Sequence, residues 1–274
     1  MIKLQETYPT LAHEKAARAI VSYFQQLPET AAVLLVNSCT RGQATSDSCL
    51  DMLVLVTPET LVQQGEQLNE NWLTFYKTEP HFAALAQAGR FAEVHLDIED
   101  GRYTPTPRTI DDATDSFELA VGNHLAYSLI LWERNDYATQ LKKQWLPYYA
   151  EPLRQERLVQ IQNACRHHLE HIPLYARREL YFAAFDRLYT SFQLFMQALF
   201  IAHGTYPIAY NKWIREQVEE ILALPDLYRL LPGVLEVRPF TSGIVTSRAQ
   251  ELATLLERYA EKKLPAAPQS NSQN

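Results

Sequence analysis

The segment 33–56, with the sequence VLLVNSCTRGQATSDSCLDMLVLV, constrains the fold of this 274-residue chain more than any other segment. Two aliphatic runs flank a polar loop that contains Gly42, and short aliphatic runs bounded by turn residues are typical of buried strands. We therefore expect strands over 32–36 and 50–56, with Asp51 near the start of the second. These two strands are the centre of the predicted fold.

The loop between the two strands resembles the signature of the polymerase-β-type nucleotidyltransferase superfamily. In that signature a strand ends in Gly-Ser, a short loop with Arg-Gly follows, and Asp-x-Asp opens the next strand. Two residues depart from the pattern: Asn37 stands where the first glycine is usual, and Cys49 stands where the first metal-binding aspartate is usual. The residues that match, without a gap, are Ser38, Arg41, Gly42, Asp47, Ser48 and Asp51.

The resemblance implies an α+β fold, in which a nucleotidyltransferase-like mixed-sheet domain precedes an all-helical C-terminal domain. A third strand is expected over 91–98, and the proline-containing connector 103–108 marks the boundary between domains. We therefore place the first domain at 1–110, the helical bundle at 111–264 and a disordered tail at 265–274. Tyr206-Pro207 and Lys212-Trp213 resemble the helical domain of small-molecule, antibiotic-type nucleotidyltransferases.

Carboxylates on neighbouring strands are the natural ligands of Mg²⁺, which prefers hard oxygen donors in octahedral geometry. Alternation along 91–98 places Glu93, His95 and Asp97 on one face of the strand. The resemblance implies that Asp51 and Asp97 are the catalytic, metal-binding carboxylates. Asp47 is a further candidate ligand. Mg²⁺ or Mn²⁺ is the expected cofactor.

Cys49 raises three alternatives for the metal site, because a thiol is a soft and poor ligand for Mg²⁺. In the first, Asp47 supplies the missing oxygen ligand. In the second, the site binds a softer metal or only one metal ion. In the third, the protein keeps the nucleotidyltransferase fold but has lost the transferase activity. Residues 47, 49 and 51 share a face if the strand begins early. The chain is therefore either a nucleotidyltransferase or a catalytically impaired pseudoenzyme that binds nucleotide or regulates a partner.

Three residues are candidates for nucleotide binding: Ser38, Arg41 and Lys212. A serine hydroxyl and a planar guanidinium suit phosphate oxygens. The alternative for Arg41 is an exposed arginine in a polar turn, and the alternative for Lys212 is a solvated side chain in a first helical turn. Asn37 fits in place of glycine if the turn requires left-handed backbone.

The expected reaction is transfer of a nucleoside monophosphate, with AMP as the expected group, from its triphosphate to a small-molecule or protein acceptor. ATP is thus the expected nucleotide partner. A net charge of −7 disfavours a nucleic-acid partner. Three unpaired cysteines, a polar N-terminus and the charges within the apolar stretch 180–201 indicate a cytoplasmic protein that does not span a membrane.

Two further motifs occur in the segment predicted to be helical. Asp115-x-x-Glu118 resembles a capping box that would open a helix extending through Trp132. His167, Glu170 and His171 form H-x-x-E-H, the order of ligands in one class of zinc peptidase. No distal ligand accompanies that motif, so zinc hydrolysis is the weaker alternative.

Overall fold

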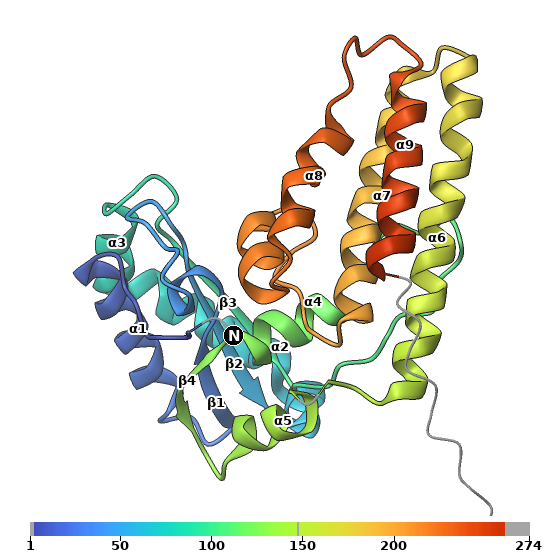
Figure 1. Ribbon diagram of the computed structural model, residues 1–274. Helices are drawn as coiled ribbons and strands as arrows, with labels where there is room; N and C mark the ends of the chain where they lie inside the picture. The colour runs from blue at the N-terminus through green and yellow to red at the C-terminus, as the bar shows by residue number, and fades with distance from the viewer. Residues whose placement is uncertain (1–2, 147, 261–274) are drawn as a thin grey trace, which may run out of the picture. The chain divides into compact units, whose positions relative to one another are not determined.

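The computed structural model describes residues 3–146 and 148–260, which fall into two compact units (Figure 1). The first unit lies within Met1–Thr106 and Ser116–Tyr148, and the second within Pro107–Asp115 and Tyr149–Asn274. A mixed sheet with helices builds the first unit, whereas the elements described in the second are all helical. The predicted α+β class is confirmed.

The sheet has the strand order β3-β2-β1-β4. β1 (Thr30–Leu35) runs antiparallel to both β2 (Leu50–Val56) and β4 (Leu129–Glu133), and β3 (Val94–Glu99) runs parallel to β2. The two strands predicted over 32–36 and 50–56 are thus present as β1 and β2. β2 and β1 are the inner strands, and this explains why their residues are aliphatic on both faces.

Helices cover both faces of the sheet. Met52 and Val54 pack toward α1 (Leu11–Phe24) and α2 (Pro58–Thr78), together with Trp72. The alternate residues of the strand, Leu53 and Leu55, pack toward α5 (Tyr137–Trp145) on the opposite face. Because side chains alternate along a strand, Asp51 lies on the same face as Leu53. α3 (Pro80–Ala86) packs beside α1, and these helices surround the sheet in Figure 1.

The helix predicted from Asp115 through Trp132 is wrong. α4 is short (Phe117–Val121), is followed by the helical turn η2 (Gly122–Ala126), and gives way to strand β4. The aliphatic sequence of β4 pairs with the otherwise open edge of β1, so tertiary pairing overrides the helical pattern. This return of 116–148 to the sheet also makes the first unit larger than the predicted domain 1–110.

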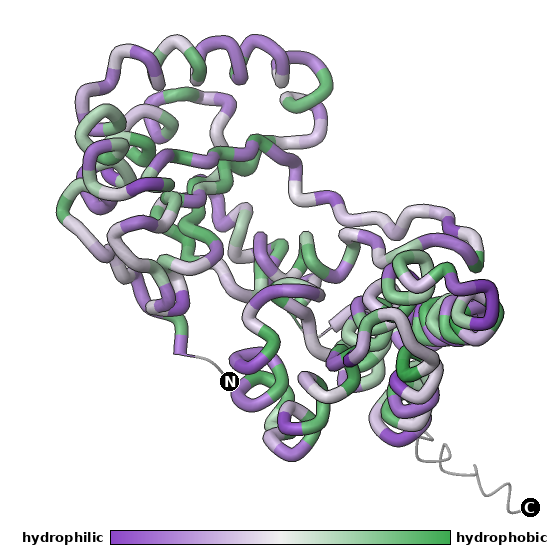
Figure 2. Tube along the Cα trace, turned by 90° about the horizontal axis from the view of Figure 1, so that it is seen from above, coloured by the Kyte–Doolittle hydropathy of each residue, from purple (hydrophilic) through white to green (hydrophobic). Residues whose placement is uncertain are grey.

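Four long helices form the second unit: α6 (Glu151–Arg177), α7 (Tyr181–Ala202), α8 (Pro225–Leu235) and α9 (Ile244–Leu255). α6, α7 and α9 pack against one another, and Figure 2 shows hydrophobic and hydrophilic residues alternating along this part of the chain. Two helical turns, η3 (Glu216–Ile221) and η4 (Leu256–Ala260), complete it. The predicted tail 265–274 lies outside the described residues. No helix among those described is long and apolar enough to cross a bilayer.

Asp115 ties the segment Pro107–Asp115 to α6. Its carboxylate accepts hydrogen bonds from Arg157 at 2.8 and 2.9 Å and from Arg108 at 2.8 Å. The two guanidinium side chains are only 2% and 5% exposed. One carboxylate therefore pairs with two buried cations, and this is the role of Asp115 in place of the predicted helix cap.

The buried amine of Lys142 in α5 is expected to make stability rise with pH. Its Nζ donates to the carbonyls of Leu125 and Ser128, each at 2.7 Å, and burial lowers the pKa of Lys142 to about 8. Between about pH 8 and 10.5 the unfolded chain binds a proton that the folded chain has released, so the free energy of unfolding increases with pH.

Urea unfolding of the natural chain and of Lys142→Met at pH 7 and pH 10 measures this linkage. We expect the stability advantage of the natural chain over the variant to grow by roughly 1–2 kcal/mol at the higher pH, after allowance for solvent screening. An advantage that stays constant over this range would mean that the amine is solvated and keeps its ordinary pKa.

Candidate functional site

The turn that follows β1 lies directly beside Asp51. The backbone N–H of Val36 donates to the carbonyl of Asp51 at 3.1 Å, so the chain enters the turn at the start of β2. Asn37 has a φ of 59° and is the first residue of the 3₁₀ turn η1 (Asn37–Thr40). The left-handed backbone is the conformation for which asparagine was expected to replace glycine.

Buried polar contacts hold both ends of the loop. Thr40 Oγ1 donates to the carbonyl of Tyr127 at 2.6 Å. At the other end, His13 Nε2 donates to the carbonyl of Ser48 at 2.9 Å, and His13 Nδ1 accepts from Thr10 Oγ1 at 2.7 Å. A carbonyl can only accept, which fixes this tautomer. The sequence did not indicate a role for His13, because the pattern of residues along its helix carries no information about a contact with Ser48, which lies 35 residues away.

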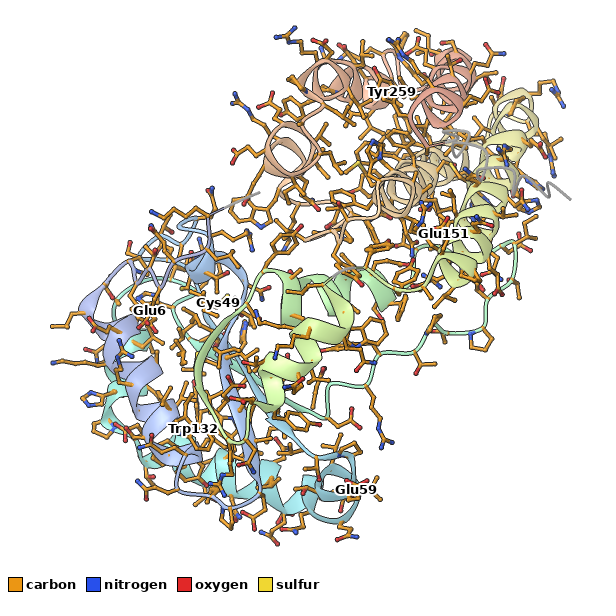
Figure 3. The ribbon with its side chains drawn as sticks, turned by 60° about the horizontal axis from the view of Figure 1, so that its bottom comes forward. Glu6, Cys49, Glu59, Trp132, Glu151 and Tyr259 are labelled. Carbon is orange, nitrogen blue, oxygen red and sulfur yellow. The ribbon has the colours of Figure 1, made fainter. Side chains whose placement is uncertain are left out.

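Three different ligand types meet at the start of β2: Cys49, Asp51 and His95. The thiol Sγ of Cys49 donates to Asp51 Oδ2 at 3.3 Å, and His95 Nδ1 lies 3.3 Å from Asp51 Oδ1. The parallel register pairs Asp51 with His95, which brings them together. Burial, followed by the charge of Asp51, raises the pKa of the Cys49 thiol to about 11. Figure 3 labels Cys49 in the loop that leads into β2.

Glu93 forms the next layer of this cluster. Its Oε1 lies 3.1 Å from His95 Nε2, the ring nitrogen that faces away from Asp51. Each ring nitrogen of His95 thus faces a carboxylate, Nδ1 that of Asp51 and Nε2 that of Glu93, and either nitrogen can donate. The side chains of His95 and Glu93 are 56% and 60% exposed, so the cluster is accessible from solvent.

Asp97 lies one step further along β3 than His95 on the same face. Its strand partner is Leu53, whereas the partner of Asp51 is His95. Asp97 lines a cavity of about 590 Å³ together with Asp51 and His95. Residues of α2 and β3 complete the lining: Asn69, Trp72, Leu73, Tyr76, Val94 and Leu96.

Asp47 is engaged in holding the loop. Its Oδ1 accepts the backbone N–H of Arg90 at 2.9 Å. Gly89 lies directly against the backbone of Ser46 and Asp47, so the two loops are closely packed. Among the described residues, the group whose ligand atoms lie within 4.8 Å of one another consists of Cys49, Asp51 and His95, without Asp47 or Asp97. Metal binding by Asp47 and Asp97 stays a prediction.

The predicted phosphate-binding residues are in three different environments. Ser38 is half-buried, and its carbonyl accepts the backbone N–H groups of Arg41 and Gln43 at 3.2 and 3.1 Å. Arg41 is only 6% exposed, so the alternative of an exposed turn arginine is wrong. Lys212 is exposed and belongs to the second unit. Their contacts with nucleotide stay predictions.

The donor set at the start of β2 does not fit Mg²⁺. A magnesium site requires oxygen ligands in nearly octahedral geometry, whereas this cluster offers one carboxylate, one imidazole and one thiol. One of the three alternatives raised by Cys49 was that Asp47 supplies the oxygen ligand that an aspartate at position 49 would have given. The geometry does not support this alternative, because the carboxylate of Asp47 accepts a hydrogen bond from the backbone of Arg90 in the neighbouring loop.

The H-x-x-E-H motif lies on α6 in the second unit. His167 Nε2 is 2.9 Å from Asp111 Oδ1, and His171 Nδ1 donates to the carbonyl of His167 at 2.8 Å. Within the described part of the chain, these side chains are not members of a group of three or more residues placed to hold a metal. His171 therefore forms a local helix contact, which gives the zinc-peptidase alternative no support.

Comparisons with known proteins leave the family of this chain open. No family model matches the chain, and no curated protein matches it. Among solved structures, it is similar to a nucleotidyltransferase-like protein from Exiguobacterium sibiricum 255-15. The two chains are 17% identical, the match covers 91% of this chain and 77% of that chain, and the TM-score is 0.45. At this distance the function has to be inferred from the chain's own residues.

Proposed function

We propose that the chain is a nucleotidyltransferase-like protein that binds a nucleoside triphosphate, ATP in the first instance, at the loop 37–51. The observation that carries the proposal is the junction between the turn at Asn37 and Asp51. Asn37 opens a left-handed turn that carries the signature residues Ser38 and Arg41, and Val36 before it is hydrogen-bonded to Asp51 at the start of β2. A phosphate-binding turn beside a carboxylate is the arrangement that nucleotidyl transfer requires.

The proposed reaction transfers AMP to a small-molecule or protein acceptor. An oxygen of the acceptor attacks the α-phosphorus, the bond from that phosphorus to the bridging oxygen breaks, and pyrophosphate leaves. The proton of the acceptor hydroxyl passes to the carboxylate of Asp97. The position of Asp97 in the same cavity as Asp51 supports this role as base.

Ser38 and Arg41 are proposed to orient the phosphates. A guanidinium supplies several donors in a fixed plane, and its charge offsets that of the phosphate oxygens. Burial of Arg41 supports this role, because a cation that is shielded from water interacts more strongly with a nearby anion. We derive no step through Mg²⁺, since the donor set at Asp51 does not suit it.

Label transfer from ATP labelled on the α-phosphorus tests the enzymatic proposal. The full chain is incubated with the nucleotide and with two acceptor pools, a deproteinised metabolite extract and a denatured protein mixture. We expect Asp51-dependent label in one pool, with Asp51→Asn and Asp97→Asn each reducing transfer at least about 100-fold. Asp226→Asn, a change at an exposed ion pair, is the matched control and leaves transfer unchanged.

A second candidate is a nucleotide-binding protein without transferase activity. This candidate is supported by the pair Cys49 and Asp51, which stands where the resemblance implies two metal-binding aspartates. The Cys49 thiol donates a hydrogen bond to Asp51 instead of contributing a second carboxylate. This candidate would be favoured if the natural chain binds ATP but transfers no more label to the acceptor pools than Asp51→Asn does. Label that depends on Asp51 would exclude it.

A further inference from the structure

Cys49, Asp51 and His95 present three chemically different ligands to one point in space. Their ligand atoms all lie within 4.8 Å of one another. The cluster combines a thiol, a carboxylate and an imidazole, and it is assembled from the loop before β2, from β2 and from β3. Thiol and imidazole ligands favour borderline or soft transition metals over Mg²⁺.

The distances within the cluster are close to those between the ligands of a tetrahedral zinc ion, although the sulfur and the nitrogen approach different oxygens of Asp51. Bonds of about 2.3 Å to sulfur and about 2.1 Å to nitrogen or oxygen, at the tetrahedral angle, separate sulfur from oxygen by about 3.6 Å and nitrogen from oxygen by about 3.4 Å. In this structure the Cys49 sulfur lies 3.3 Å from Asp51 Oδ2, and His95 Nδ1 lies 3.3 Å from Asp51 Oδ1.

Glu93 orients the imidazole for this purpose. When an ion replaces the proton between Nδ1 and Asp51, the contact of 3.1 Å with Glu93 Oε1 would hold the ring proton on Nε2 and leave the lone pair of Nδ1 for the ion. A carboxylate that accepts from the outer nitrogen of a ligating histidine is the common supporting contact in zinc sites. Glu93 is thus a positioning residue.

The fourth side of the cluster faces a space that can admit a ligand. Asp51 and His95 line the cavity of about 590 Å³ that also contains Asp97. Three protein ligands with an open fourth position are typical of a zinc ion that exchanges water or substrate. A closed structural site would instead have four protein ligands.

We propose that Cys49, Asp51 and His95 bind one transition-metal ion of the Zn²⁺ class, with Glu93 orienting His95 and one coordination position open to the cavity. The proposal explains Cys49 as a ligand rather than as the mark of a lost site. It concerns the same residues as the proposed nucleotide function. Metal binding is measured without nucleotide, however, so either proposal can fail while the other stands.

Direct metal analysis and Co²⁺ substitution of the full chain test the proposal. Purified without chelator, the chain is expected to contain one zinc ion per molecule, or to bind one Zn²⁺ on titration. Co²⁺ in the same site is expected to give the charge-transfer absorption of a cobalt–thiolate bond. Cys49→Ser retains a hydrogen-bond donor to Asp51, but we expect it to lose this band and at least about 100-fold in Zn²⁺ affinity.

Variants of the other residues separate ligands from supporting groups. His95→Gln is expected to weaken Zn²⁺ binding to the same degree as Cys49→Ser, whereas Glu93→Gln should weaken it about 10–100-fold and keep the cobalt–thiolate band. Cys49→Asp is expected to shift the preference of the site from Zn²⁺ toward Mg²⁺ and Mn²⁺. Circular dichroism of each variant checks that it is folded.

The H-x-x-E-H motif provides the matched control for histidine chemistry. The double variant His167→Gln/His171→Gln should leave zinc content and the cobalt spectrum unchanged. Three results would overturn the proposal: zinc that disappears in this double variant but stays in Cys49→Ser, a cobalt spectrum without a thiolate band, and no Zn²⁺ binding by the natural chain on titration.

Discussion

Asp115→Asn is expected to destabilise the second unit by about 3–5 kcal/mol. The substitution keeps the size of the side chain but removes the charge that neutralises Arg108 and Arg157. Both guanidinium groups then lose their charged hydrogen bonds to Asp115 in a buried environment, and breaking a buried ion pair from one side carries a penalty of this size. Urea unfolding measured by circular dichroism, with hydrogen exchange of peptides from α6, reports the loss.

Asp226→Asn is the matched control for that experiment. Asp226 pairs with Arg229 on the surface of the same unit, and the two side chains are 83% and 76% exposed. An exposed pair of this kind contributes at most about 0.5–1 kcal/mol. If both variants lose the same small amount of stability, then the arginines at Asp115 are solvated and the account of this segment is wrong.

Gly89→Ala is expected to have the largest effect on the loop that carries the site. A Cβ atom at this position would overlap the carbonyl oxygen of Ser46 and the Cα of Asp47. Backbone atoms cannot rotate away as a side chain can, so one of the two loops has to shift. We expect a loss of at least about 2 kcal/mol in unfolding free energy, together with displacement of the loop before Cys49.

The unfolding transition and the cobalt spectrum together measure this effect. The control is Gly233→Ala in α8, where an added Cβ meets no atom within 4 Å. Alanine is favoured over glycine in a helix, so this variant should match or exceed the natural chain by up to about 1 kcal/mol. Equal stability of the two variants would mean that the loops at Ser46 and Gly89 are not packed together.

Local signals in the sequence were sufficient to predict several elements of the fold. β2 occupies the predicted 50–56, because an aliphatic run bounded by polar residues identifies an inner strand. Thr57 caps α2, accepting from the backbone N–H of Thr60 at 3.2 Å. Gly204, with a φ of 59°, ends α7 as a left-handed C′ residue. Each of these features depends on neighbouring residues alone.

Long-range pairing decided what the sequence could not predict. The alternation in β3 was sufficient to place His95 and Asp97 on the face shared with Asp51, and this is the observed arrangement. The register was not predictable, however, and it is the register that puts His95 beside Asp51 and Asp97 one step away. The same limitation applies to β4, whose residues carry a helical pattern but pair with β1.

The chemistry of Cys49 also depends on its surroundings. In the sequence it replaces an aspartate and indicates loss of a metal ligand. In the structure it lies 3.3 Å from Asp51 in a cluster that includes an imidazole. The thiol is therefore accompanied by an imidazole nitrogen, and the two donors together are consistent with the proposed site of the Zn²⁺ class. Only the folded arrangement shows that they belong together.

The most direct test of the account is calorimetric titration of the full chain with a non-hydrolysable ATP analogue, with Zn²⁺, Mn²⁺ or Mg²⁺ present in separate experiments. We predict saturable binding by the natural chain, at least about tenfold weaker binding by Asp51→Asn, and unchanged binding by Asp226→Asn. Binding that is equal in the natural chain and Asp51→Asn, or that is absent with every metal, would contradict a nucleotide site at the start of β2.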